Sequence, residues 1–303
     1  MASFRAGFIS ILGRANVGKS TLFNRILGEK IAIVTETPQT TRNRILGIKN
    51  VPGGQFIFLD TPGFHEGRSG LNQRMVRTAI ASGQDADILL FVIEASSPRA
   101  EKDRQMIESF RGSKGIPFLA INKIDWVKKE SLLPIIDQYR RLHPFTMIIP
   151  ISAITGEGVD ILLDEILEVL PESPPYFPEE VMTDQTERFL ASEIIREKVI
   201  QQSYQEVPYS TAVTIEEFKE HPERNLVVIK GTIHTERDSQ RKILIGKGGQ
   251  KLKKIGEMAR KEAEAFLERR VFLDLWVSVE KDWTNDPRTL SRLGYTLPLT
   301  RRS

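Results

Sequence analysis

The chain of 303 residues is longer than one ordinary hydrophobic core supports, so its length favours two domains. Hydrophobic residues make up 40% and charged residues 27% of the sequence, a balance that is typical of folded globular proteins and argues against disorder. The absence of cysteine excludes disulfide frameworks, thiolate nucleophiles and cysteine-ligated zinc, and we expect a reducing, cytoplasmic location.

The net charge of +3 is small, but the basic residues are unevenly distributed. Residues 237–261 contain nine lysines and arginines against two acidic residues, so this segment carries +7 and the rest of the chain −4. The positive potential is therefore concentrated where a polyanion could bind.

The sequence predicts no membrane span. Residues 1–13 include a short apolar run without a long hydrophobic region or a cleavage site of small residues, so we expect a strand there. No stretch approaches the roughly 18 consecutive apolar residues that a spanning helix needs. Peripheral attachment stays open.

From residue 8 to residue 170, short apolar runs alternate with longer amphipathic stretches, which predicts an α/β fold with a mostly parallel sheet covered by helices. The runs are nearly all apolar, as in strands buried on both faces. The expected strands span residues 7–12, 45–49, 56–59, 88–93, 117–121 and 148–151, the second as an antiparallel partner. The expected helices include residues 20–27, 71–82, 101–110 and 159–170. We assign residues 1–172 to this domain.

A proline-rich segment follows the first domain. The run Pro-Glu-Ser-Pro-Pro-Tyr-Phe-Pro at residues 171–178 cannot continue a helix, because proline lacks an amide hydrogen and restricts the residue before it. Such a composition is typical of an extended, semi-rigid spacer. We place the interdomain linker at residues 173–182.

The remaining sequence predicts a smaller α+β domain at residues 183–285 and a tail at residues 286–303. The expected elements are a helix at 185–203, strands at 210–218 and 226–235, a basic helical region and a strand at 271–279. The last strand alternates, with Val271, Leu273, Leu275, Val277 and Val279 on its core face. From Pro287 onward we expect irregular structure.

The sequence Gly13-Arg-Ala-Asn-Val-Gly-Lys-Ser20 matches the phosphate-binding pattern G-x-x-x-x-G-K-[ST], between a buried strand and a helix. Backbone amides at the glycines and the helix N-terminus would hold phosphate oxygens. Lys19 is expected to reach the β- and γ-phosphates, and Ser20 to ligate Mg²⁺. The expected nucleotide contacts here are Gly13, Arg14, Ala15, Asn16, Val17, Gly18, Lys19, Ser20 and Thr21. A glycine turn with an ordinary helix cap is the disfavoured alternative.

Two further loops are expected at the same edge of the sheet and indicate which base is bound. In Asn122-Lys-Ile-Asp125, the carboxylate of Asp125 can accept from N1 and the 2-amino group of guanine, a donor pair that adenine lacks. Ser152 and Ala153 would place backbone amides near the guanine oxygen. The residues assigned to the base are Asn122, Lys123, Ile124, Asp125, Ser152 and Ala153. The predicted ligand is GTP or GDP.

Two segments are expected to respond to the γ-phosphate. Asp60-Thr-Pro-Gly63 would place a carboxylate beside Mg²⁺ and a glycine amide beside the γ-phosphate. A threonine of residues 38–42 would complete the metal shell, with Thr41 favoured over Thr40, although this segment could be only a solvated turn. The expected metal ligands are Ser20, Thr41 and Asp60. The residues expected to act in hydrolysis are Lys19, Thr41 and Gly63, and those of the second segment that contact nucleotide are Asp60, Thr61, Pro62, Gly63 and Phe64.

These five segments, in this order, resemble the TRAFAC class of GTPases, and Thr-Thr-Arg and Asp-Thr-Pro-Gly resemble its Era-like branch. Phe64 stands where Ras-like proteins carry a water-orienting glutamine, so slow intrinsic hydrolysis is expected. Asn16 resembles the P-loop asparagine of potassium-stimulated relatives, which makes K⁺ a candidate cofactor beside GTP/GDP and Mg²⁺; a solvated loop residue is an equal alternative. His65 is more often a plain loop residue than a general base.

The segment Ile243-Leu-Ile-Gly-Lys-Gly-Gly249 passes from apolar residues into a G-x-x-G turn and a basic helix. Glycines let a nucleic-acid backbone approach, and the lysines could clamp its phosphates. With the order helix, strand, strand, helix, helix, strand, this predicts a type II KH domain that binds single-stranded RNA. The expected RNA contacts are Ile245, Gly246, Lys247, Gly248, Gly249, Lys251 and Lys254. A merely solvated charged helix face is the less favoured alternative.

A GTPase domain followed by one KH domain resembles the Era family of ribosome-assembly GTPases over nearly the whole chain, and Trp283 and Leu293-Gly-Tyr295 also fit that family. The resemblance implies binding near the 3′ end of 16S ribosomal RNA, a role in 16S rRNA processing and 30S subunit biogenesis, and partial peripheral association with the inner membrane. We expect a monomer. The tail after Tyr295 is longer than expected and receives no role.

Two other functions stay open at this point. A signalling switch at the membrane would use the second domain to dock protein or lipid, with the basic helix facing anionic headgroups, although this helix lacks large exposed aromatic residues. An RNA-binding module with a barely hydrolysed, structural nucleotide would also fit Phe64.

Overall fold

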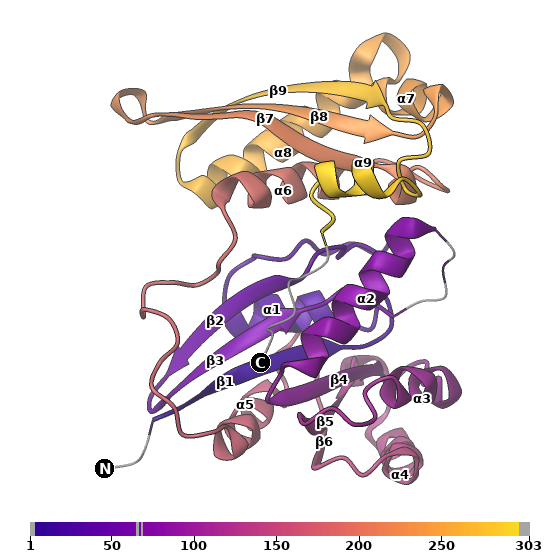
Figure 1. Ribbon diagram of the computed structural model, residues 1–303, viewed down its shortest axis with the longest axis vertical. Helices are drawn as coiled ribbons and strands as arrows, with labels where there is room; N and C mark the ends of the chain where they lie inside the picture. Colours follow the sequence, from indigo (N-terminus) through magenta and orange to yellow (C-terminus); the bar gives the residue numbers. More distant parts are fainter. Residues whose placement is uncertain (1–3, 65–66, 68, 297–303) are drawn as a thin grey trace.

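The computed structural model describes residues 4–64, 67 and 69–296. Figure 1 shows two bodies stacked along the long axis, a larger N-terminal one and a smaller C-terminal one. The α/β architecture and the smaller α+β domain that the sequence predicts are confirmed.

The first body is built on a six-stranded sheet in the order β2-β3-β1-β4-β5-β6. All neighbouring strands are parallel except β2 and β3, which are antiparallel as expected. The strands are β1 (Arg5–Leu12), β2 (Ile45–Val51), β3 (Gly54–Asp60), β4 (Ile88–Glu94), β5 (Ile116–Asn122) and β6 (Met147–Pro150). β3 is buried at every position, because helices or the linker cover both faces of the sheet.

Helices cover the sheet on two sides: α1 (Lys19–Leu27), α2 (Gly70–Gln84), α3 (Ala100–Glu108), α4 (Leu132–Leu142) and α5 (Val159–Val169). One apolar cluster joins the strands to α1 and α5, and another joins them to α3 and α4. Helix α4 was not predicted from the sequence. Its signal is the pair Ile135 and Tyr139, four residues apart and buried, on an otherwise largely exposed helix.

The linker lies fixed along the edge strand β2. The amide of Ile48 donates to the carbonyl oxygen of Met182 at 2.8 Å, and the side chain of Gln55 donates to that of Phe177 at 2.9 Å. Phe177 and Val181 pack on the apolar patch of β2 and β3. These contacts hold the linker extended, so it acts as a strap on the first domain.

The second body packs three helices against one face of a three-stranded sheet. Its elements are α6 (Glu187–Gln201), β7 (Ala212–His221), β8 (Leu226–Thr235), α7 (Asp238–Ile245), α8 (Gln250–Leu267) and β9 (Arg270–Val279). β8 pairs antiparallel with β7 and parallel with β9. Val271, Leu273, Leu275 and Val277 of β9 face this core as expected, whereas Phe272 and Trp276 are exposed on the other face. Short 3₁₀ turns are η1 (Ile124–Trp126), η2 (Lys129–Ser131), η3 (Pro208–Ser210), η4 (Pro222–Arg224) and η5 (Lys247–Gly249).

The prediction of irregular structure from Pro287 onward is wrong at its start, because α9 (Pro287–Arg292) is helical. Asp286 caps this helix by accepting from the amide of Thr289 at 2.8 Å, and proline fits the first helical position. Leu290 is buried beside Trp283, whose ring stacks on that of Tyr295. Arg301 and Arg302 lie outside the described residues.

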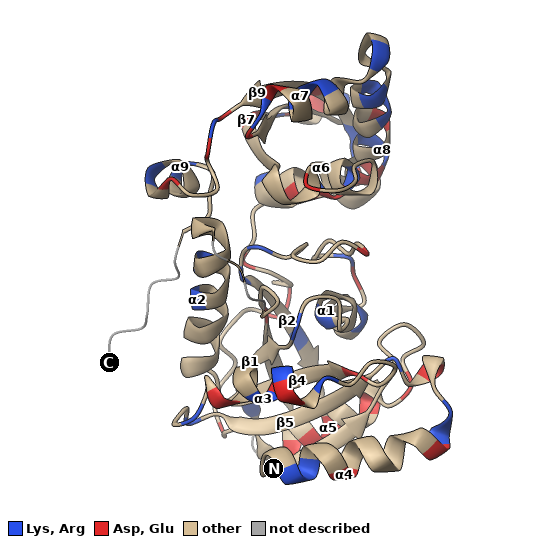
Figure 2. Cartoon of the chain, turned by 90° about the vertical axis from the view of Figure 1, so that its right-hand side faces the viewer, with Lys and Arg blue, Asp and Glu red and all other residues tan. Residues whose placement is uncertain are grey.

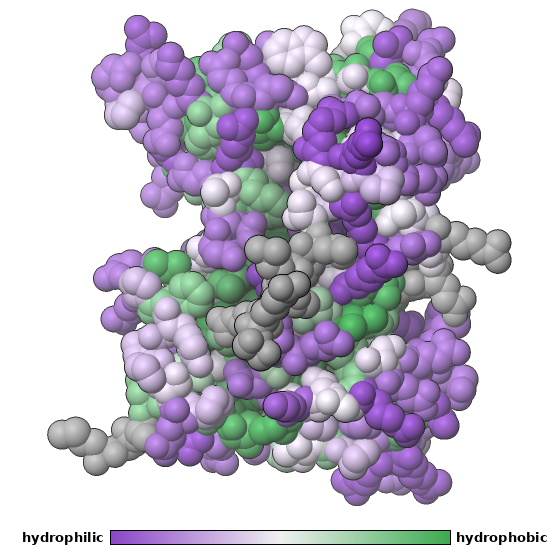
Figure 3. Space-filling model, in the orientation of Figure 1, coloured by the Kyte–Doolittle hydropathy of each residue, from purple (hydrophilic) through white to green (hydrophobic). Residues whose placement is uncertain are grey.

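In the described part of the chain, no helix has both the length and the apolar character needed to cross a bilayer. Figure 3 shows a mixed surface on the face of Figure 1, with hydrophilic residues predominating and hydrophobic ones in smaller patches between them. Such a mixture is ordinary for a protein surface.

Candidate nucleotide site and RNA-binding surface

The P-loop between β1 and α1 has positive φ angles at Gly18 and Asn16, a conformation that favours glycine and asparagine. Gly18 has φ 97°, and a Cβ there would lie 2.2 Å from the side-chain nitrogen of Asn122. Asn16 also has positive φ, at 64°. The amide of Asn122 donates to the carbonyl oxygen of Val17 at 2.8 Å, so the base loop and the phosphate loop are joined.

Lys19 lies buried at the start of α1, where its ammonium donates to the carbonyl oxygen of Arg14 at 3.0 Å. Burial lowers the pKa of Lys19 to about 8, although the charge of Asp60 opposes this shift. The site therefore holds a desolvated cation whose charged form an anionic phosphate would stabilise.

Three oxygen atoms that could ligate a metal come together from the start of α1, the end of β3 and residues 38–42, which we call the first switch. The hydroxyl of Ser20 lies 2.7 Å from a carboxylate oxygen of Asp60 and 2.8 Å from the hydroxyl of Thr41. Burial raises the pKa of Asp60 to about 6, and its other carboxylate oxygen has no hydrogen-bond partner among the described residues. A buried carboxylate with an unpartnered oxygen beside two hydroxyls fits Mg²⁺, which prefers oxygen ligands.

The two candidate threonines of the first switch have different surroundings. The Thr40 hydroxyl donates to the carbonyl oxygen of Thr37 at 2.6 Å and also contacts the Thr35 hydroxyl. Thr41 instead faces Ser20 and Asp60. This placement supports the assignment of Thr41 to the metal, which stays a prediction.

The second switch, which begins at residues 60–63, lies against the P-loop. A Cβ at Gly63 would lie 2.8 Å from the backbone of Ala15, so this position needs glycine. The amide of Phe64 donates to the carbonyl oxygen of Gly13 at 3.0 Å, and its ring lies edge-on to Phe110 at 5.7 Å. Phe64 therefore serves packing and has no group to orient water. His65 lies outside the described residues.

The side chains of several predicted nucleotide contacts have partners within the protein and do not face the cavity. Arg14 turns to Asp103 at 2.6 Å, and Val17 is fully buried in the core. The Thr61 hydroxyl donates to the carbonyl oxygen of Ile11 at 2.6 Å. These side chains hold the loops in place, so only their backbone is left for a nucleotide.

The base loops differ in part from expectation. Asp125 is exposed in the turn η1, where its carboxylate can reach a ligand. The amide of Ala153 donates to the side-chain oxygen of Asn122 at 2.9 Å, and that of Ser152 donates to the carbonyl oxygen of Glu157 at 2.9 Å. Both amides thus have acceptors within the protein, and the bond from Ala153 holds the loop of Asn122 in place.

Trp126 was not predicted from the sequence. Its side chain is 61% exposed and lines the same cavity as the P-loop, with the ammonium of Lys123 4.9 Å from its ring centroid. Ile154, which follows Ser152 and Ala153, lines the same cavity and is also exposed. The available signal was an aromatic residue directly after Asp125, where a flat base needs a stacking surface.

The cavity formed by these segments measures about 480 Å³, which suits a nucleotide. Its lining combines P-loop, first-switch and base-loop residues: Ala15, Asn16, Gly18, Lys19, Ser20, Thr21, Ile33, Val34, Thr35, Glu36, Gln39, Thr40, Thr41, Gly63, Lys123, Trp126 and Ile154. The first switch closes one side, partly because the side chain of Asn16 donates to the carbonyl oxygen of Glu36 at 2.6 Å.

The first switch is also packed on the second domain. Arg42 is buried and donates to the carbonyl oxygens of Thr211 at 2.6 Å and Pro208 at 2.8 Å. Arg196 of α6 donates to the carbonyl oxygen of Thr40 at 2.5 Å. The residue on either side of Thr41 is therefore held by the other domain.

The second switch region makes similar contacts. The amide of Leu71, in the first turn of α2, donates to the carbonyl oxygen of Thr284 at 2.7 Å. Leu71 and Met75 pack in one apolar cluster with Trp283 and Tyr295. Both switch regions thus contribute to the interdomain interface.

The second domain presents its G-x-x-G turn between α7 and α8. Gly246, Gly248 and Gly249 all have positive φ, and a Cβ at Gly246 would lie 2.7 Å from that of Lys251. Lys247 and Lys254 are exposed, whereas Lys251 is partly buried, which lowers its pKa. Ile245 closes α7. The turn can therefore admit a phosphate backbone between cations.

Comparisons with known proteins agree with the two domains of this fold. Residues 8–123 match the family model described as 50S ribosome-binding GTPase, and residues 206–284 match the KH domain model. GTPase Era of Syntrophus aciditrophicus is 56% identical, covering 96% of this chain and 95% of its own. A crystal structure of Era in complex with MgGDPNP and nucleotides 1506–1542 of 16S ribosomal RNA shares 43% identity at a TM-score of 0.92, covering 97% of this chain and 100% of its own.

A second solved structure, an Era variant of Aquifex aeolicus bound to GDP.AlF4-, shares 42% identity at a TM-score of 0.90, covering 97% of this chain and 100% of its own. The similarity spans both domains and nearly the full length of every one of these proteins. Identity of this extent over both domains shows that the chain belongs to the Era family of GTPases.

Proposed function

We propose that this GTPase couples its nucleotide state to binding of 16S ribosomal RNA near the 3′ end, during 16S rRNA processing and 30S subunit biogenesis. One observation carries the coupling: Thr41, whose hydroxyl contacts Ser20 and Asp60, lies between Thr40 and Arg42, both of which contact the KH domain. The RNA follows from the KH domain and from the related structure that contains a 16S rRNA fragment.

The residues in and beside the cavity fit their proposed roles in GTP binding, with Asp125 exposed between Lys123 and Trp126 of the lining. The cation of Lys19 would hold the β- and γ-phosphates, Gly63 would offer its amide to the γ-phosphate, and Asp125 would select guanine. Mg²⁺, when bound by Ser20, Thr41 and Asp60, neutralises charge on the phosphates. Because both switch regions meet the KH domain, loss of the γ-phosphate would loosen its support.

Intrinsic hydrolysis is proposed to be slow, since the ring of Phe64 packs on Phe110 and offers no hydrogen-bonding atom to water. K⁺ bound near Asn16 would supply positive charge, supported by the place of this residue on the cavity wall. Equal rates of GTP hydrolysis in potassium and sodium buffers would exclude the role of K⁺.

The proposed location is the cytoplasm, with a monomeric protein whose attachment to the inner membrane, where it occurs, is peripheral. Support comes from the charged exposed residues of α8, which suit an anionic surface without insertion. Flotation with vesicles and light scattering test these two points separately.

The decisive experiment is titration of the protein with 16S rRNA in GTP and in GDP, measured by filter binding. We expect tighter binding in one nucleotide state, and the double substitution Lys247→Ala plus Gly248→Asp should weaken binding in both. Equal affinity in GTP and GDP would leave two independent modules, and unchanged binding by the variant would exclude the KH turn as the RNA site.

A further inference from the structure

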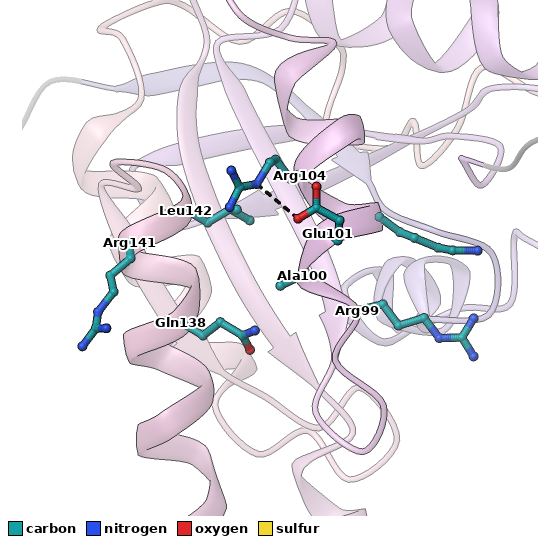
Figure 4. A pocket seen from close by; sticks show the side chains of 8 residues that line it. Arg99, Ala100, Glu101, Arg104, Gln138, Arg141 and Leu142 are labelled. Carbon is teal, nitrogen blue, oxygen red and sulfur yellow. Dashed lines mark ion pairs between the residues drawn. The ribbon is translucent and has the colours of Figure 1, made fainter.

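A second cavity, of about 450 Å³, lies between α3 and α4, outside both the nucleotide site and the KH turn. Figure 4 shows Arg99, Glu101 and Arg104 on the α3 side and Gln138 and Arg141 on α4. We call it the α3–α4 pocket. Its full lining is Arg99, Ala100, Glu101, Lys102, Arg104, Gln138, Arg141 and Leu142.

The α3–α4 pocket has four cationic side chains and one carboxylate. That carboxylate, Glu101, faces Arg104 at 3.7 Å in an exposed and therefore weak pair. Among the described residues, no ion pair is recorded for Arg99, Lys102 or Arg141. The rim of the pocket thus carries excess positive charge, which suits an anion, and Figure 4 shows the side chains of Arg99 and Arg141 pointing away from one another on its two sides.

The helices that carry these cations are held together by a buried carboxylate. Asp103, fully buried in α3, accepts from Arg14 of the P-loop at 2.6 Å and from the hydroxyl of Tyr139 in α4 at 2.5 Å. Burial and the hydrogen bond to Asp103 raise the pKa of Tyr139, so this hydroxyl stays a donor. The cations therefore project from a fixed frame, which reduces the entropy lost on binding.

The α3–α4 pocket and the G-x-x-G turn lie on one side of the molecule. α3, α4 and α7 are at the right of Figure 1, and in the view of Figure 2, turned to that side, all three face the reader. They belong to opposite ends of the long axis. One long polyanion could therefore contact both sites, whereas an oligonucleotide held by the turn could not.

We propose that the α3–α4 pocket binds the phosphate backbone of the same structured RNA that the KH domain holds, as a second electrostatic contact made by the GTPase domain. The inference rests on the proposed RNA-binding function and adds a surface to it. Phosphates are the anions that a long RNA presents at regular spacing, and arginines bind them through several donors at once. The concave shape favours RNA over the flat surface of an anionic bilayer.

The test compares two RNA probes and matched variants. The pocket variant Lys102→Glu plus Arg141→Glu changes one residue on each helix, and Arg77→Glu plus Lys114→Glu makes the same charge change outside the lining. The probes are intact 16S rRNA and a single-stranded oligonucleotide of about eight nucleotides, twice the four that a KH turn clamps. GTP affinity serves to show that each variant is folded.

We expect the pocket variant to bind 16S rRNA at least about tenfold more weakly than the control variant at about 0.1 M salt, because phosphate contacts by lysine and arginine release counterions and supply much of the affinity. Its salt dependence should be shallower, and its oligonucleotide affinity unchanged. If this variant loses GTP binding, Arg99→Gln plus Arg104→Gln replaces it as the milder test. Equal binding of 16S rRNA by pocket and control variants overturns the inference.

The KH variant and the parent protein test the proposed function separately from the pocket. If the KH variant Lys247→Ala plus Gly248→Asp binds neither 16S rRNA nor the oligonucleotide, the proposed function holds even where the pocket variant binds normally. If the parent protein binds neither RNA, the proposed function is wrong. If the pocket variant keeps 16S rRNA but no longer binds phosphatidylglycerol vesicles, the pocket serves a membrane and the inference is wrong.

Discussion

The guanidinium group of Arg42, in the first switch, donates a 2.6 Å hydrogen bond to the carbonyl oxygen of Thr211 in the KH domain. The same group lies 5.9 Å from the ring centroid of Trp283 and 5.8 Å from that of Tyr295. A buried cation with carbonyl and aromatic partners is held in one position. Arg42 therefore links the residue after Thr41 to the other domain.

Replacing Arg42 with alanine should release the KH domain from the first switch, because the carbonyl oxygens of Thr211 and Pro208 lose the guanidinium donor that joins them to this segment. Small-angle scattering should show a larger radius of gyration, and the RNA affinity should differ less between GTP and GDP. Arg44→Ala, two residues away, is the control. An unchanged radius would show that Arg42 does not hold the interface.

Asp125→Asn should lower the affinity for GTP about 100-fold or more, because the amide brings an N–H towards the donor face of guanine. The same amide can pair with the second oxygen of xanthine, so the affinity for xanthosine triphosphate should rise. Competition against labelled GDP measures both changes. Asp137→Asn, on exposed α4, should change neither, and a variant that keeps its preference for GTP would refute the assignment.

Thr41→Ala should raise the Mg²⁺ concentration needed for half-maximal GTP hydrolysis by about tenfold or more, if its hydroxyl is a metal ligand. Thr40→Ala should leave this concentration nearly unchanged, since the hydroxyl of Thr40 contacts Thr35 and Thr37. Titrations with Mg²⁺ at saturating GTP distinguish the two. The reverse order would assign the metal to Thr40.

Trp126→Ala should weaken binding of GTP and GDP alike by about 1–3 kcal/mol, if its exposed ring stacks on the base. Because stacking does not depend on the γ-phosphate, the ratio of the two affinities should hold. Isothermal titration calorimetry measures both affinities, with Trp276→Ala in the KH sheet as the control. Equal affinities in both variants would remove Trp126 from the site.

Local patterns predicted where the strands of the first domain lie in the sequence, because buried parallel strands are short apolar runs between amphipathic helices. They were wrong about α9, whose six residues form a helix only with the cap from Asp286 and the burial of Leu290. They also did not single out α4. A helix that buries two side chains gives a weak periodic signal.

The candidate site followed the same division. The P-loop and the G-x-x-G turn could be predicted because contiguous residues form each of them, and their glycines adopt backbone that few others allow. Trp126 was missed because its position directly after Asp125 is a single-residue signal that no repeated pattern reinforces. The expected role of the Ser152 and Ala153 amides ignored acceptors that only the folded chain supplies.

The sequence by itself determined the class of ligand and the presence of two domains, because each segment predicted to contact phosphate, guanine or RNA consists of a few consecutive residues. Only the tertiary structure decided how these segments meet. Arg42 and Thr211 are 169 positions apart, and the α3–α4 pocket joins two helices with no shared motif. Contacts between distant residues depend on the packing of whole elements, which no local pattern encodes.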